Sequence, residues 1–438
     1  ERVLFFPPLG VLPYDFEAQS QEVVGQRLRV LERLLEGEGE LMIVTTIPAL
    51  QRALPPAESL EGRDITIGVG SVLDREELLE KLIWLGYERV ELVEGRGQFA
   101  VRGSIVDIFP LTTEYPYRIE FFDDEVDSIR QFALEDQLSR QEVEAVKIFP
   151  ARELVLTPAE RDRGREELAQ RGKELCRRLE GRGRGQLSRK LRQRWEQYYE
   201  EAENYIYYRG IDNLLPLYFP APASLLDYLP AGAVVILDEP VRLQERARDF
   251  QAQMVEIHTN LLEEGRAFPL QLDNYLSWEK IAAGCRRHRL LSLAHFLRSS
   301  PEATPEAIFS FLAKDVPSYQ ANRELIKGDL ALWQRRRYQI LLFASSRERG
   351  GRLVDFLAEE GFAPVLVEEG EPPREGQIQI RKGVLTKGFE FPDLKLVVLT
   401  EQDLFGHQKA RSLARLRPKG KKVRAAADLK PGELVVHV

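Results

Sequence analysis

The sequence predicts an α/β protein of several domains, and three observations support this prediction. The chain has 438 residues, more than a single hydrophobic core usually holds. Apolar runs at 41–46, 234–240 and 338–346 are each followed by a helical pattern, as in alternating strand–helix units. Residues 97–132 instead alternate apolar and polar side chains, which indicates hairpins of half-buried strands.

The first unit is expected to hold a helix followed by a strand. Ser20 can cap the helix, and Gly37 can end it. The run "LMIVTT" that follows has the composition of a strand buried on both faces. The apolar stripe of the helix consists of Val24, Leu28, Leu31 and Leu35.

Residues 73–157 have the pattern of a compact α+β domain. Asp74 and Glu77 resemble a capping box that starts a helix, and Gly86 can end this helix. Several short strands with alternating polarity follow it.

Within this domain, the strand from Tyr117 to Phe122 places an arginine and a large aromatic on its polar face. Strand side chains alternate, so Arg118, Glu120 and Phe122 share one face. Phe122 can tuck under the following turn while Arg118 pairs with Glu120 or a neighbouring strand. Alternatively, the two side chains form a binding surface, because arginine and exposed aromatics dominate interface hot spots. Arg102 could extend such a surface.

Two segments are strongly basic although the whole chain has a formal charge of -8. Residues 160–194 hold thirteen Lys/Arg and six Asp/Glu, a net charge of +7, with a "GRGRG" break at 181–185. This pattern is typical of a solvated helical arm, and a nucleic-acid contact is the alternative. Residues 409–425 hold eight Lys/Arg and no acid, which indicates a flexible basic linker.

The run "VVILDE" has the form of a Walker B strand, in which Asp238 would hold Mg²⁺ and Glu239 would orient water. The chain contains no G-x-x-x-x-G-K-[ST] loop to cradle phosphates, so we expect no ATPase inside it. Five histidines without H-x-x-H spacing make a metal site unexpected. Cys176 and Cys285 suggest no disulfide framework, and no apolar run is long enough to cross a membrane, so we expect a cytoplasmic protein.

Five segments of the chain are specific enough to compare with known families: "FPPLGVLPYD", "GQFAVRGSIVDIFP", "YPYRIEFFDDEVDSIRQF", "GIDNLLPLYF" and "KGFEFPDLKLVVLTEQDLFG". They closely resemble the N-terminal part of the bacterial transcription-repair coupling factor family (Mfd), which shares its architecture with the excinuclease subunit UvrB. The resemblance implies a degenerate P-loop/RecA-like domain of UvrB type, an inserted α+β UvrA-binding domain and a small additional α/β domain.

The resemblance also implies roles for individual residues. Arg102, Arg118 and Phe122 match the family's UvrA-contacting positions, and Asp238–Glu239 becomes a relic of a nucleotide-binding ancestor. The chain is then a non-catalytic adaptor without a cofactor, part of a longer protein. ATP, Mg²⁺ and DNA would bind the family's motor beyond residue 438, RNA polymerase would bind the following domain, and a C-terminal domain would cover the UvrA-binding surface.

The expected domains follow from the composition and the resemblance together. The domains are 1–72, UvrB domain-1a-like; 73–157, UvrA-binding; 158–318, helical arm and domain-1b-like part; 319–406, small α/β domain; 407–425, linker; and 426–438, the start of the RNA-polymerase-interacting domain.

Two other functions are alternatives to the adaptor. The first is an enzyme, either UvrB itself or a helicase core. The second, which the sequence supports less, is a nucleic-acid-binding module that uses the arm.

Overall fold

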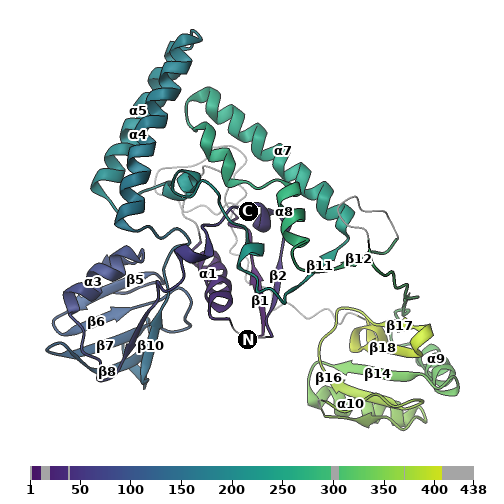
Figure 1. The fold of residues 1–438 in the computed structure, drawn as a ribbon. Helices are drawn as coiled ribbons and strands as arrows, with labels where there is room; N and C mark the ends of the chain where they lie inside the picture. Colours follow the sequence, from purple (N-terminus) through teal and green to yellow (C-terminus); the bar gives the residue numbers. More distant parts are fainter. Residues whose placement is uncertain (1, 11–19, 38–39, 297–304, 369, 407–438) are drawn as a thin grey trace, which may run out of the picture. The chain divides into compact units, whose positions relative to one another are not determined.

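The computed structural model describes residues 2–10, 20–37, 40–296, 305–368 and 370–406. The chain divides into two compact units, Glu1–Thr304 and Pro305–Val438 (Figure 1). Both units combine helices with sheets, which confirms the predicted α/β multidomain class. The P-loop/RecA-like assignment and the domain ranges stay predictions, and the predicted linker and final domain start lie outside the described residues.

The first unit begins with two parallel strands joined by a helix: β1 (Val3–Phe6), α1 (Gln21–Leu35) and β2 (Met42–Thr45). Ser20 occupies the N-cap position, although its side chain makes no cap hydrogen bond, and Gly37 follows the helix with φ 68°. Leu28 and Leu31 of the predicted stripe are fully buried.

The prediction that the strand at 41–46 is buried on both faces is wrong, and the strand within the apolar run at 234–240 is not fully buried either. Met42 is 59% exposed in β2, and Ile236 is 54% exposed in β11 (Val234–Asp238). Both strands pair in parallel, β11 with β12 (Arg289–Leu293). Within the described residues, one face of each pair remains open, because an apolar run specifies a strand but not the layer that covers it.

The first unit also contains a six-stranded sheet in the order β4-β5-β6-β7-β8-β9, which has a hydrophobic core of its own. The helix α3 (Arg75–Trp84) packs its leucines on one face of it (Figure 1). As predicted, Asp74 caps this helix by accepting the Glu77 backbone N–H at 3.1 Å, and Gly86 adopts φ 90° after it. The strands are β4 (Glu88–Val90), β5 (Gln98–Arg102), β6 (Ile105–Ile108), β7 (Tyr117–Phe122), β8 (Glu125–Phe132) and β9 (Ser139–Glu142), with β3 (Ile65–Gly68) and β10 (Ala145–Ile148) paired separately.

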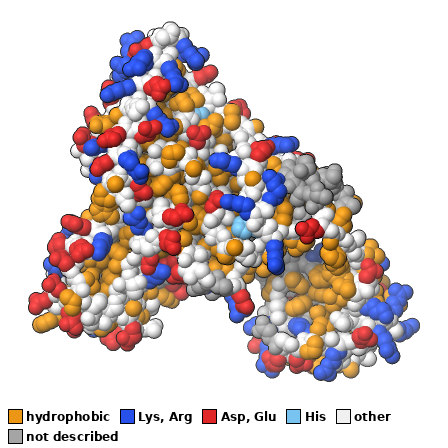
Figure 2. Space-filling view, in the orientation of Figure 1, with side chains coloured by type: hydrophobic (Ala, Val, Ile, Leu, Met, Phe, Trp, Pro, Cys, Tyr) orange, Lys and Arg blue, Asp and Glu red, His pale blue; other side chains and the backbone are white. Residues whose placement is uncertain are grey.

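The predicted arm is a helical hairpin of α4 (Pro158–Gly181) and α5 (Gly185–Asn204), which run side by side (Figure 1). A capping box between Thr157 and Glu160 starts α4. We call the end of the hairpin that contains the turn between α4 and α5, residues 173–192, its outer end. Lys and Arg side chains gather there (Figure 2).

The remainder of the first unit is mostly helical. The long helix predicted after residue 240 is α7 (Pro240–Glu264), and it precedes the strand β12. The hydrophobic core of this helical part is rich in aromatic residues. In it, the rings of Trp195 and Tyr198 from α5 each make an edge-on contact with the ring of Phe268. The shorter helices are α2 (Ile47–Gln51), η1 (Ala57–Ser59), η2 (Ile211–Leu214), α6 (Leu215–Tyr218), η3 (Leu225–Tyr228), η4 (Pro269–Asn274) and α8 (Trp278–Cys285).

The second unit is a six-stranded sheet in the order β13-β17-β18-β14-β16-β15. The strand β14 pairs in parallel with both β16 and β18, as alternating strand–helix units usually do, whereas β13 and β17 are antiparallel additions. The elements are β13 (Lys314–Asp315), α9 (Arg323–Arg335), β14 (Gln339–Ala344), α10 (Arg347–Glu359), β15 (Val365–Leu366), β16 (Ile378–Lys382), β17 (Phe389–Phe391), η5 (Pro392–Leu394), β18 (Leu396–Thr400) and α11 (Glu401–Phe405).

None of the helices in the described part of the chain is long and apolar enough to span a membrane. Cys176 and Cys285 are both buried and are not joined by a disulfide.

Candidate docking surface

A buried carboxylate joins two arginines on the face of the six-stranded sheet opposite α3. The side chain of Asp107 in β6 is only 1% exposed, and Asp107 pairs in register with Arg118 of β7. Arg118 donates from Nε to Oδ1 at 2.7 Å and from Nη2 to Oδ2 at 3.0 Å. Arg102, at the end of β5, donates to the same Oδ2 at 2.5 Å. One negative charge thereby holds two positive charges in fixed positions.

Arg118 is largely part of the framework. Its side chain is 15% exposed, its guanidinium lies 4.9 Å above the Phe132 ring, and it also donates to the Gln137 carbonyl at 3.2 Å. The hydrogen bond with Asp107 raises the pKa of Arg118 above its ordinary value. Arg102, in contrast, is 47% exposed, so its guanidinium is the accessible member of the cluster.

Phe122 projects from the end of β7 and is 75% exposed. The turn after it is tight, with Asp123 at φ 53°. Glu125 pairs across the sheet with Phe122 and, on its other side, with Val72, which is also 75% exposed. Because cross-strand partners point to the same face, two exposed apolar side chains flank one acid at this corner.

A second charge cluster shares the sheet face. Arg130 in β8 donates to Glu120 at 3.0 Å and to Glu142 at 3.1 Å, and Ser128 donates to Glu120 at 3.0 Å. Glu120 is thus occupied by Arg130 and not by Arg118.

The structure decides between the two interpretations of this strand only in part. Arg118 does pair with a neighbouring strand, as one interpretation expected, but its partner is Asp107 and not Glu120. The expectation that Phe122 tucks under its turn is wrong, because the ring is mostly exposed. Phe122, Arg102 and the framework residue Arg118 lie in one sheet, so the face offers a rigid combination of an apolar and a cationic group. That combination suits recognition of a partner and supplies no nucleophile or proton relay.

Asp107 was not predicted from the sequence as a site residue. The signal was present, because an acid interrupts the apolar run "SIVDIF" at a position whose alternation matches the face of Arg118. A carboxylate in such a strand needs a cationic partner when it is buried.

The Walker-B-like pair lies elsewhere in the first unit, at the carboxyl end of β11. Glu239 has φ 55° and accepts the His295 backbone N–H at 2.8 Å and contacts its ring Nδ1 at 2.5 Å. These hydrogen bonds lower the pKa of Glu239, the one to the backbone N–H most strongly. Asp238, at the end of the strand, is exposed. Among the described residues, no group of three or more His, Cys, Asp or Glu side chains is placed to hold a metal ion.

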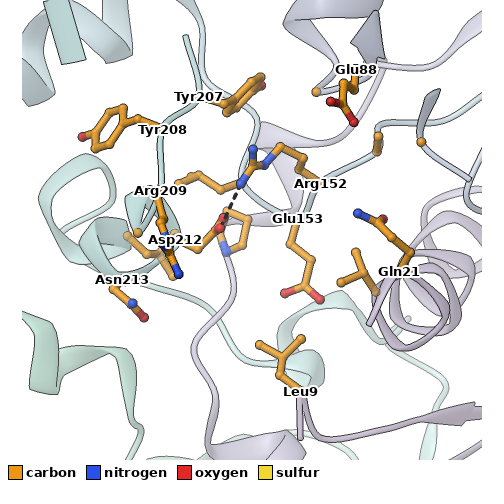
Figure 3. A pocket seen from close by; sticks show the side chains of 18 of the residues that line it. Leu9, Gln21, Glu88, Arg152, Glu153, Tyr207, Tyr208, Arg209, Asp212 and Asn213 are labelled. Carbon is orange, nitrogen blue, oxygen red and sulfur yellow. Dashed lines mark hydrogen bonds and ion pairs between the residues drawn. The ribbon is translucent and has the colours of Figure 1, made fainter. Parts of the chain in front are cut away.

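A polar cleft of about 750 Å³ lies between the segments around Arg152 and Asp212 (Figure 3). Arg152 pairs with Asp212 at 3.0 Å and lies 4.6 Å above the Tyr207 ring. Burial raises the pKa of Tyr207 to about 12. Glu153 pairs with the fully buried Arg27 of α1 at 2.5 Å. These two ion pairs join segments that are far apart in the sequence, so Arg152, Glu153 and Asp212 hold the walls of the cleft together.

Residues 65–154, which hold the Asp107 cluster and Phe122, match the UvrB interaction domain family. The whole chain also aligns with a transcription-repair-coupling factor from Bacillus subtilis (strain 168), at 31% identity over 450 residues. The predicted resemblance to transcription-repair-coupling factors is confirmed. A second such factor, from Staphylococcus aureus (strain MRSA252), is 27% identical over 444 residues. The chain spans 37% of the length of each of these two transcription-repair-coupling factors.

Proposed function

We propose that this chain is the UvrA-recruiting adaptor part of a transcription-repair coupling factor, and that it carries no catalytic activity itself. The observation that supports this most directly is the 75% exposed Phe122 on the same strand as Arg118 of the arginine cluster, inside the segment that matches the UvrB interaction domain. Aromatic and arginine side chains dominate the binding energy of protein interfaces, so an exposed ring and an accessible arginine on one rigid sheet suit a partner surface.

In this proposal the three predicted site residues have two different tasks. Phe122 and Arg102 contact UvrA, because both are accessible. Arg118 acts mainly as a positioning residue, since Asp107 and the Gln137 carbonyl occupy most of its donors. The partner surface should offer an apolar pocket for the ring and a carboxylate for Arg102.

The remaining functions belong to the longer protein. The adaptor would act on stalled RNA polymerase through a following domain, and a motor that binds ATP, Mg²⁺ and DNA would supply the movement. A C-terminal domain of the same protein would cover the UvrA-binding surface until the motor engages. This chain should therefore bind UvrA more tightly than the full-length protein does, because no covering domain has to be displaced.

Capture of purified UvrA on the immobilised chain tests the proposal. The chain should retain UvrA, and the Arg102→Ala variant should retain clearly less. Failure of the unmodified chain to retain UvrA at micromolar concentration would overturn the proposal. The rival enzyme interpretation is tested separately by ATP turnover.

A further inference from the structure

The outer end of the α4–α5 hairpin carries a concentration of positive charge that is separate from the proposed UvrA-binding surface. Residues 173–192 contain eight Lys/Arg and two Asp/Glu, although the whole chain has a formal charge of -8. The two acids are already engaged, because Arg178 pairs with Glu174 and Arg192 pairs with Glu180. Six exposed bases have no acidic partner among the described residues: Lys173, Arg177, Arg182, Arg184, Arg189 and Lys190.

The charge is polarised along the hairpin. Residues 195–204, at the opposite end of α5, contain four acids and no base. Figure 2 shows Lys and Arg side chains gathered at the outer end. A solvated arm would gain solubility from mixed charges along its whole length, whereas this separation directs a positive field outward from one end.

The outer end is also held in a defined shape. The Ser188 hydroxyl of α5 lies 3.3 Å from the Cys176 carbonyl oxygen of α4 and 3.1 Å from the Glu180 carboxylate, and its single proton is shared between these two acceptors. Farther down the hairpin, the Trp195 ring N–H donates to the Leu168 carbonyl. The basic residues are therefore displayed on a fixed support and not on an unstructured tail.

The composition of this end favours one class of partner. No large hydrophobic side chain between residues 158 and 204 is strongly exposed, so the surface lacks the apolar groups that insert into a membrane or anchor a protein interface. It also lacks exposed aromatic rings for stacking on unpaired bases. Arginine guanidinium groups match phosphate geometry well.

We propose that the outer end of the α4–α5 hairpin binds the phosphate backbone of double-stranded DNA without sequence preference. The inference is independent of UvrA recruitment. If all six unpaired bases contact phosphates, the logarithm of the affinity should fall with the logarithm of the salt concentration with a slope of about -5.

The test is a fluorescence-anisotropy titration of a labelled duplex of arbitrary sequence with the whole chain, at several KCl concentrations. The triple variant Arg177→Glu, Arg182→Glu, Arg184→Glu should bind at least tenfold more weakly, with a salt slope shallower by about 3. The matched control reverses three exposed bases of α7 and α8, Arg246→Glu, Arg248→Glu and Lys280→Glu, and should bind within twofold of the unmodified chain. A triple variant with Gln at 177, 182 and 184 removes the same charges without adding acids. Circular dichroism checks that each variant is folded.

Several results would overturn the proposal. One is an unchanged affinity for the duplex in the folded Glu and Gln triple variants. Another is an equal loss of duplex affinity in the hairpin Glu variant and the α7–α8 control, because the effect would then come from net charge alone. Vesicles containing anionic lipid serve as the competing probe. Hairpin-dependent binding to vesicles with no binding to the duplex would replace DNA by a lipid surface.

Discussion

Asp107 and Arg118 face each other across β6 and β7 and share two hydrogen bonds, at 2.7 and 3.0 Å. The carboxylate is buried, and the arginine is nearly so. A buried charge is tolerated only with its partner, so each of these residues is a structural requirement for the other. This relationship changes how a substitution of Arg118 should be interpreted, because a loss of UvrA binding could follow from damage to the sheet.

Replacing Asp107 by Asn should destabilise the sheet domain by about 3 kcal/mol, because Arg118 and Arg102 lose their shared counter-charge. Thermal unfolding followed by circular dichroism measures this effect. Glu120→Gln is the matched control: Glu120 is partly exposed and holds Arg130 on the same face, and its loss should cost under about 1 kcal/mol. Equal destabilisation by the two substitutions would contradict the organising role of Asp107.

Apolar periodicity was sufficient to predict several helices and strands and the parallel pairing in the second unit, because burial of an apolar stripe is a local property of the sequence. It predicted α7 and the core positions Leu28 and Leu31, whereas the charge content of residues 160–194 predicted the arm. It could not predict that Arg102 and Arg118, five and eleven residues from Asp107, meet on one carboxylate, because strand register depends on the intervening turns.

The same limit explains other differences. Arg27 is fully buried although arginine is a surface residue in most helices, since Glu153, 126 residues away, and the Phe6 ring enclose it. The open faces of β2 and β11 reflect the same problem, because no local pattern reveals which layer covers a strand. The exposure of Phe122 was suggested by its place on the polar face of β7 and by the resemblance, and it needed the structure to be established.

Gly172 is required for the packing of the arm. A Cβ at this position would lie 2.0 Å from Nε1 of Trp195, with the indole ring fixed by its hydrogen bond to Leu168. We expect Gly172→Ala to lower the unfolding free energy by about 1 to 3 kcal/mol. Gly181→Ala is the control, because a Cβ there meets open space. Denaturant titration of both variants checks the prediction, and an unaffected Gly172→Ala variant would contradict the tight packing.

Glu32 in α1 should make the stability depend on pH. Burial raises the pKa of its carboxyl from 4.5 to about 7, partly offset by a hydrogen bond with Thr112. The folded protein therefore binds this proton more tightly than the unfolded chain, so the contribution of Glu32 to the unfolding free energy decreases as pH rises from about 4.5 to 7. Glu32→Gln should raise the melting temperature at pH 8 and change it little at pH 4.5. Calorimetry at both pH values measures this, and a gain limited to low pH would show that the sign is wrong.

ATP turnover should be absent from this chain. The sequence has no lysine-containing phosphate loop, and Glu239 is held by His295 with φ 55°, so its carboxylate is not positioned to orient water. Phosphate release in the presence of ATP and Mg²⁺ should stay at the buffer background. Turnover that disappears in Glu239→Gln would favour the enzyme interpretation.

The most direct test of the account is the affinity of UvrA for the Phe122→Ala variant, measured by isothermal titration calorimetry. We expect a loss of about 2 kcal/mol, roughly thirtyfold in Kd, without a change in melting temperature, because the 75% exposed ring contributes little to the fold. Tyr205→Ala removes another exposed aromatic, 61% exposed at the end of α5, and should leave the affinity unchanged. Equal UvrA affinity for the Phe122→Ala variant and the unmodified chain would contradict the assignment of this surface.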